Sequence, residues 1–148
     1  MPALAMWNQI LVLVFAAICA AEDYRSRKVS MSVLLLFALI GGVMSFLLKR
    51  KPDEIIGALV PGFLITMLSF ASSGCVGMGD ALFLIVGGLY QNSSIIIQNV
   101  LITWGLASLI ALIIVVKCQL TNCKRKPGGI PFITLMTLVM IINRNGFG

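Results

Sequence analysis

The chain has 148 residues, of which 59% are hydrophobic and only 11% are charged, and its formal net charge is +6. Ordinary soluble domains hold about 25% charged residues, so this composition, with a mean hydropathy of +1.06, predicts an all-α polytopic membrane protein. Because the chain has no histidine, Ser-His and Cys-His nucleophile pairs and histidine-ligated metal sites are excluded.

Apolar segments separated by short polar clusters follow one another along the chain. A helix needs about 20 apolar residues to cross a bilayer core. Six segments are predicted as transmembrane helices: residues 4–21, 31–48, 55–72, 80–91, 95–116 and 130–143. The fourth and sixth are short, and tilting or burial beside other helices would accommodate them. Since no separate soluble region remains, residues 1–148 are predicted to form a single transmembrane domain.

The first segment is predicted to be a retained helix rather than a secretory signal peptide, because no basic residue precedes it. Its basic residues follow it, at Arg25, Arg27 and Lys28, and the positive-inside rule then places the N-terminus outside. The same orientation puts seven basic residues on the inner side and four on the outer side: Lys49, Arg50, Lys51 and Arg144. The positive charge is therefore attributed to membrane orientation, and no nucleic-acid partner is expected.

Two glycine pairs, Gly41-Gly42 and Gly87-Gly88, lie inside apolar segments, where glycine permits close helix packing. The four cysteines give a weaker signal. Cys118 and Cys123 have a C-x4-C spacing, which indicates a metal site or a disulfide far less strongly than paired C-x-x-C motifs do. Reduced thiols are the favoured interpretation, and neither a metal nor a cofactor is predicted.

Two of the five acidic residues stand at the ends of apolar segments. Asp23 ends the first segment, and Asp80 opens the fourth in the sequence Gly77-Met78-Gly79-Asp80. A carboxylate beside a membrane segment is costly and indicates a functional site. After Asp23 the chain leaves the inner face by one helix and returns by the next before it reaches Asp80. Both aspartates are therefore predicted to lie at the same, inner face.

Two carboxyl groups held close together tend to share one proton and titrate as a coupled pair. One can then act as a base and the other as an acid. Such a pair can activate water for attack on a peptide carbonyl without histidine, a metal or a covalent intermediate. Gly77 and Gly79 would shape the turn before Asp80 and let a substrate strand approach closely.

Simpler interpretations of these acids stay open. Asp80 is well suited to cap the following helix, with the glycines forming the turn, and Asp23 could belong to a solvated charge cluster. Glu22 diverges from Asp23 by about 100° on a helix and cannot face the same site. Asp53 and Glu54 are predicted to lie at a helix N-terminus on the outer side.

These motifs resemble the prepilin peptidase family, which comprises type IV leader peptidases and archaeal preflagellin peptidases. The segment Asp23-Tyr24-Arg25-Ser26-Arg27-Lys28-Val29-Ser30 resembles the family's first-aspartate motif, and Gly77-Met78-Gly79-Asp80 resembles its GxGD signature. Gly129-Ile130-Pro131-Phe132 resembles a late segment before the last helix. In this chain Val29-Ser30 replaces the usual Ile-Pro, and Leu82 stands where many members have lysine.

The resemblance implies a membrane aspartyl endopeptidase that cleaves the basic leader from a type IV pilin, Flp pilin or preflagellin. Cleavage would occur at the cytoplasmic membrane face of a bacterium or archaeon. Asp23 and Asp80 would be the catalytic pair, and Gly77 and Gly79 would shape the loop of the second aspartate. The chain resembles the short form without paired C-x-x-C motifs, so methyl transfer is not expected.

Three other classes of membrane protein compete with this interpretation. Presenilin-like proteases also carry GxGD, but they are larger, and the Pro-Ala-Leu segment that follows their two aspartates has no counterpart after Asp80. A small proton- or cation-coupled transporter would place its acids near the middle of a span. A noncatalytic membrane scaffold would use the small residues for helix packing alone.

Overall fold

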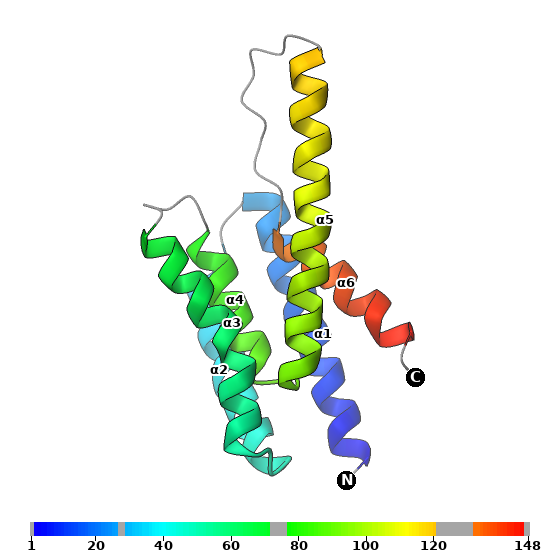
Figure 1. Cartoon of the computed structure of the whole chain (residues 1–148). Coiled ribbons are helices and arrows are strands. Elements are labelled where there is room, and N and C mark those ends of the chain that lie inside the picture. Colours follow the sequence, from blue (N-terminus) through cyan, green and yellow to red (C-terminus); the bar gives the residue numbers. More distant parts are fainter. Residues whose placement is uncertain (1, 27–28, 72–76, 121–131, 147–148) are drawn as a thin grey trace.

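A computed structural model of the chain describes residues 2–26, 29–71, 77–120 and 132–146. These residues form helices and no strand, as the sequence predicts (Figure 1). The helices are α1 (Pro2–Ser26), α2 (Met31–Leu47), α3 (Pro52–Ala71), α4 (Met78–Gly88), α5 (Ser93–Leu120) and α6 (Phe132–Gly146).

Three of these helices, α1, α3 and α5, are long and apolar enough to cross a membrane. The helices α2, α4 and α6 are also apolar but shorter. With 11 residues, α4 is about 16 Å long, against about 30 Å for the hydrocarbon core of a bilayer. The helical membrane class is thus confirmed, whereas six crossings and an outside N-terminus stay predictions.

Two helix boundaries differ from the sequence prediction near the aspartates. The first helix continues past residue 21 to Ser26, so Asp23 lies within α1 rather than beyond it. The fourth helix begins at Met78 and includes Asp80 in its first turn. Hydropathy marks only where apolar residues stop, whereas a helix continues as long as its backbone hydrogen bonds do.

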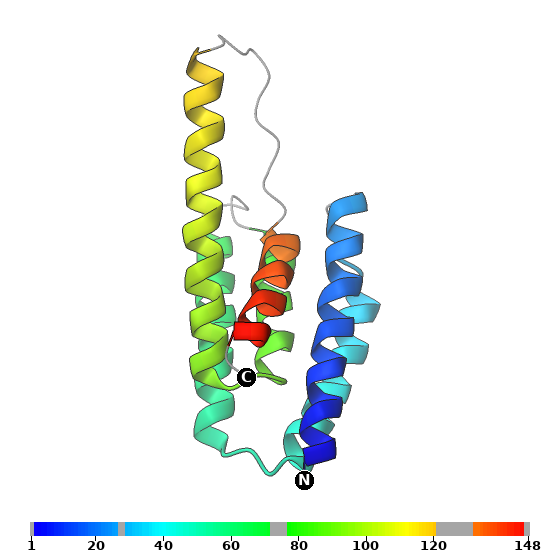
Figure 2. The same ribbon diagram turned by 90° about the vertical axis from the view of Figure 1, so that its right-hand side faces the viewer.

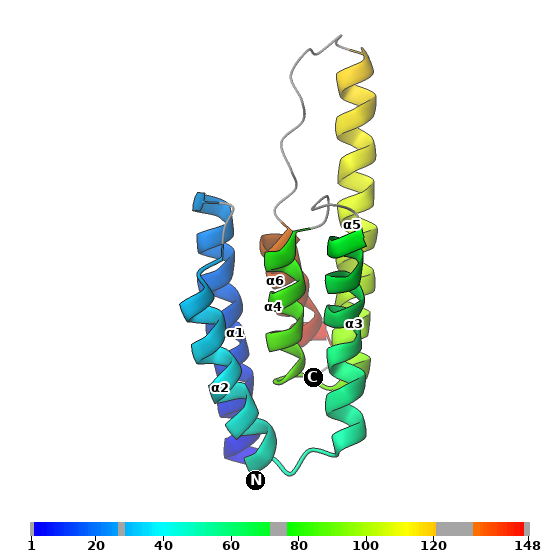
Figure 3. The ribbon, with the colours of Figure 1, turned by 90° about the vertical axis from the view of Figure 1, so that its left-hand side faces the viewer.

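The helices are arranged in three layers. In Figures 2 and 3, α1 and α2 occupy one side, α3 and α5 occupy the other, and α4 and α6 lie between them. The ring of Phe15 on α1 packs against Phe37, Phe83 and Tyr90, with ring centroids 5.1, 5.2 and 6.4 Å away. This aromatic cluster joins α1, α2 and α4 in the core.

Glycine allows α3 and α4 to approach closely. A Cβ atom added at Gly88 would lie 2.6 Å from the carbonyl oxygen of Ala58, and one added at Gly62 would lie 2.5 Å from Cγ1 of Ile85. A Cβ atom added at Gly41 on α2 would likewise lie 2.8 Å from the ring of Tyr90. The predicted close packing is therefore confirmed at Gly41 and Gly88.

The other member of each glycine pair does not have this role. A Cβ atom at Gly42 would have no neighbour within 4 Å, and one at Gly87 would make only an ordinary contact of 3.9 Å. The packing prediction was wrong for these two positions, because neighbouring residues on a helix point in different directions.

The C-terminal end of α4 is anchored by polar side chains from α2 and the segment that follows it. The guanidinium of Arg50 donates to the carbonyls of Gly88, Leu89 and Gln91 at 3.4, 2.8 and 2.5 Å. Ser45 Oγ donates to the Leu89 carbonyl at 2.6 Å. These donors satisfy carbonyls that a helix end leaves without an intrahelical partner.

Candidate active site

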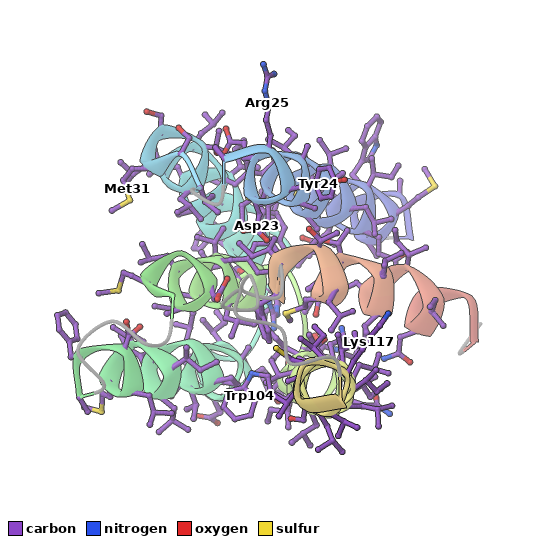
Figure 4. The ribbon with its side chains drawn as sticks, turned by 90° about the horizontal axis from the view of Figure 1, so that it is seen from above. Asp23, Tyr24, Arg25, Met31, Trp104 and Lys117 are labelled. Carbon is purple, nitrogen blue, oxygen red and sulfur yellow. The ribbon has the colours of Figure 1, made fainter. Side chains whose placement is uncertain are left out.

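Asp23 lies in the last turn of α1 and is half-buried. Viewed from above in Figure 4, Asp23 is on the side of α1 that faces α4 and α6, whereas Arg25 extends away from the bundle. Tyr24 is 80% exposed. The helix therefore separates Asp23 from the outward-facing residues of the same segment.

Asp80 lies in the first turn of α4 and is also half-buried. The N-cap of this helix is Gly77, which has an extended backbone and makes no side-chain cap hydrogen bond. The backbone N–H of Asp80 donates to the Gly77 carbonyl at 3.1 Å. Asp80 is thus inside the helix, three residues after the cap, and the interpretation of Asp80 as the N-cap was wrong.

The two aspartates come from separate helices but act on each other electrostatically. Burial raises the pKa of Asp80 to about 6, and the negative charge of Asp23 raises it in the same direction. Asp80 lies in the first turn of α4, at the end of the helix rather than in its middle. Two carboxyl groups within range of each other's charge hold a proton more tightly than an isolated one does.

The two glycines before Asp80 lie on different sides of the start of α4. Gly77 makes room for the second aspartate, since an added Cβ atom would lie 2.8 Å from Oδ2 of Asp80. Gly79 is a helical residue of α4 rather than part of a loop, and an added Cβ would meet Val29 at 3.7 Å. The loop role predicted for Gly79 therefore needs correction, because α4 starts earlier than hydropathy indicated.

Glu22, the neighbour of Asp23, has a structural role in the connection between α1 and α2. Its carboxylate accepts a hydrogen bond of 2.8 Å from the backbone N–H of Ser30, the N-cap residue of α2. Glu22 therefore links the end of α1 to the start of α2. Asp53 and Glu54 lie in the first turn of α3, which confirms their predicted place at a helix N-terminus.

Cysteine and metal chemistry receive no support from the described part of the chain. Within it, no three histidine, cysteine, aspartate or glutamate side chains are grouped closely enough to hold a metal ion. Cys19 is buried in α1, and Cys118 lies half-buried in α5. Several predicted features lie outside the described residues, namely Arg27, Lys28, Cys75, Cys123 and the 129–131 part of the late motif.

Sequence reasoning missed one polar residue with a clear structural part. Arg50 was counted only as one of the outer basic charges, whereas its guanidinium holds the end of α4. Its position in the short basic segment between α2 and α3 carried no signal for this role. The acceptors lie about 40 residues further along the chain, and only the tertiary structure brings them together.

The sequence matches the profile of the type IV leader peptidase family over residues 10–116. The match covers more than two thirds of the chain and includes both Asp23 and Asp80. No curated protein and no solved structure matches the chain.

Proposed function

Because the chain belongs to the type IV leader peptidase family, we propose that it is a membrane aspartyl endopeptidase that removes the basic leader from prepilin-like proteins. Asp23 and Asp80 are its catalytic pair. The substrates are a type IV pilin, an Flp pilin or a preflagellin, each with an apolar helix that lies in the membrane beside the enzyme.

The placement of the two aspartates carries this proposal: Asp23 is on the side of α1 that faces α4, Asp80 lies in the first turn of α4, and the charge of Asp23 raises the pKa of Asp80. In a pair that shares one proton, the ionised carboxylate removes a proton from water as the water oxygen attacks the scissile carbonyl carbon. The protonated carboxyl hydrogen-bonds the carbonyl oxygen, and a proton passes to the amide nitrogen as the C–N bond breaks. The products are a free carboxylate and a free amine.

The position of the acids also favours hydrolysis over transport. A coupled transporter places its carboxylates near the middle of a span, whereas Asp23 lies in the last turn of α1 and Asp80 in the first turn of α4. Half-exposed carboxyl groups at helix ends are accessible to water and to a leader that stays outside the bilayer. We place this end at the cytoplasmic face of a bacterial or archaeal membrane, with the N-terminus outside.

Substitution of each aspartate by asparagine tests the mechanism. Asp23→Asn and Asp80→Asn keep the side-chain shape but remove the ability to exchange a proton, so each is expected to slow leader cleavage at least about 100-fold. The measurement is the mass shift of a cognate prepilin incubated with purified enzyme in detergent.

Glu22→Gln is the matched control, since it removes a neighbouring carboxylate while an amide oxygen remains to accept the Ser30 hydrogen bond. This variant should cleave at close to the wild-type rate. Cleavage at the wild-type rate by either aspartate variant would disprove the two-aspartate mechanism.

A further inference from the structure

A cavity of about 640 Å³, lined by carboxamide and apolar side chains, lies at the opposite end of the bundle from the aspartates. It is bounded by the N-terminal half of α1, the turn between α4 and α5, the start of α5 and the end of α6. Seven of the chain's ten asparagine and glutamine residues line it, and no acidic residue does: Asn8, Gln9, Gln91, Asn92, Gln98, Asn99 and Asn143.

Hydrogen bonds hold the buried wall of this carboxamide cavity in place. Asn99 is 1% exposed; its amide donates to Gln91 Oε1 at 3.2 Å, and its Oδ1 accepts from Asn143 at 2.8 Å. Asn8 donates to the Tyr90 carbonyl at 2.7 Å. Groups fixed in this way are arranged before a ligand arrives, which lowers the entropic cost of binding.

Other polar side chains of the cavity are exposed and can hydrogen-bond to a ligand. The side chains of Gln9, Asn92 and Gln98 are exposed. An exposed carboxamide offers both a donor and an acceptor, so a ligand that itself offers an acceptor and a donor would be favoured here.

The electrostatics favour a neutral ligand over an anion. Among the described residues, Arg50 is the one charged residue of the lining, and its guanidinium already donates to three carbonyls at and just after the C-terminal end of α4. The remaining polar groups are carboxamides, each of which donates and accepts. The main chain of a polypeptide offers the complementary pair, an N–H and a C=O in every residue.

The length of α1 relates the cavity to the proposed catalytic pair. Asn8 and Asp23 stand about 15 residues apart on this helix, which corresponds to about 22 Å. A substrate helix that begins near the aspartates and runs along the bundle would reach the cavity after about the same number of residues. At its end, a helix leaves four carbonyls without partners, and such groups need partners near a membrane.

We propose that the carboxamide cavity binds the main chain of the substrate where its membrane helix ends and the following segment begins. This inference rests on the proposed function and adds a second recognition site, one that selects substrates by the length of their membrane helix. The aspartates act on the leader end, and the carboxamides hold the other end.

The double variant Gln9→Leu/Gln98→Leu tests the inference, since it removes two exposed carboxamides and keeps side chains of similar size. With a full-length prepilin, its KM should rise about tenfold and its kcat should stay unchanged. With a substrate truncated at the end of its membrane helix, wild type and variant should have equal KM values. Ser94→Ala, an exposed residue of α5 outside the cavity lining, is the matched control and should resemble wild type.

Binding of a leaderless peptide, made of the membrane helix and the following segment, separates this inference from the proposed catalysis. Its Kd for the double variant should be about tenfold higher than for wild type. Unchanged KM and Kd would overturn the cavity's role and leave the peptidase intact, as would equal weakening of the full-length and truncated peptides. Wild-type enzyme that fails to cleave but shows the Kd difference would instead overturn the peptidase and retain the cavity.

Discussion

Asp80 owes its properties to three features of its surroundings. Burial removes water from the carboxyl group, Asp23 adds a like charge, and Gly77 leaves space beside Oδ2 where any other side chain would intrude. The first two features raise the pKa of Asp80, so the folded protein binds this proton more tightly than the unfolded chain does. The residue that the sequence suggested for catalysis is therefore also one that lowers stability when it ionises.

The pH dependence of stability tests this description of Asp80. Its pKa is about 6 in the folded protein and 3.8 ordinarily, so the protonated group contributes stability that is lost as the pH rises from about 4 to 6. Asp80→Asn lacks this loss. After allowance for solvent screening, the free energy of unfolding of the variant relative to wild type should be about 1 kcal/mol higher at pH 7 than at pH 4. This difference corresponds to about 2–4 °C in Tm.

Thermal unfolding in detergent at the two pH values provides the measurement. Asp53→Asn, an exposed acid in the first turn of α3, serves as the control and should show no comparable gain. If the Tm difference between Asp80→Asn and wild type were the same at both pH values, the description of Asp80 as a buried carboxyl group beside the charge of Asp23 would be wrong.

At the scale of the elements, α4 depends on close contacts along its whole length. Its first turn carries Asp80, its middle and end pack against α3 through Gly62 and Gly88, and its C-terminal carbonyls accept hydrogen bonds from Arg50. A helix of 11 residues has little stability alone. Its position, and with it the distance from Asp80 to Asp23, is therefore set by its neighbours.

Two glycine-to-alanine substitutions test this packing. Gly88→Ala would place a methyl group 2.6 Å from the backbone oxygen of Ala58, so it should lower the free energy of unfolding by about 1–3 kcal/mol. Gly42→Ala meets nothing within 4 Å and should raise it by about 0.5–1 kcal/mol through helix propensity.

Both values come from thermal unfolding of the purified variants. Equal stabilities for the two variants would show that α3 and α4 do not approach each other as closely as described.

For the whole molecule, orientation in the membrane decides whether the aspartates can meet a leader. The proposed topology has six crossings, the N-terminus outside, and the end of the bundle with Asp23 and Asp80 inside. Arg25 and Lys51 are both exposed; Arg25 lies in the last turn of α1, and Lys51 lies between α2 and α3. They should therefore be on opposite sides of the membrane.

Single-cysteine labelling tests this topology, with the four native cysteines replaced by serine. In intact cells, a membrane-impermeant maleimide should label Lys51→Cys and spare Arg25→Cys until the membrane is permeabilised. The opposite pattern would place the aspartates outside and contradict the cytoplasmic site.

Much of the architecture could be predicted from local sequence. The all-helical class follows from the long apolar segments. In the hydrocarbon core every backbone N–H and C=O group needs a partner within the protein, and a single apolar segment provides these partners by forming a helix. Asp53 and Glu54 were placed correctly at a helix N-terminus because acids there are favoured by the helix dipole. Helix ends near Asp23 and Asp80 were predicted less well, because polar residues can continue a helix after the apolar segment has ended.

The amino-acid sequence by itself determined the helical membrane class, the lack of histidine chemistry and the presence of acids at the ends of two apolar segments. These are properties of composition and local order. Only the tertiary structure decided that the charge of Asp23 raises the pKa of Asp80, that Gly77 leaves space for the Asp80 carboxyl group, and that seven carboxamides line one cavity. Each of these depends on the rotation and packing of helices distant in the chain, and one residue's shift on a helix turns a side chain by about 100°.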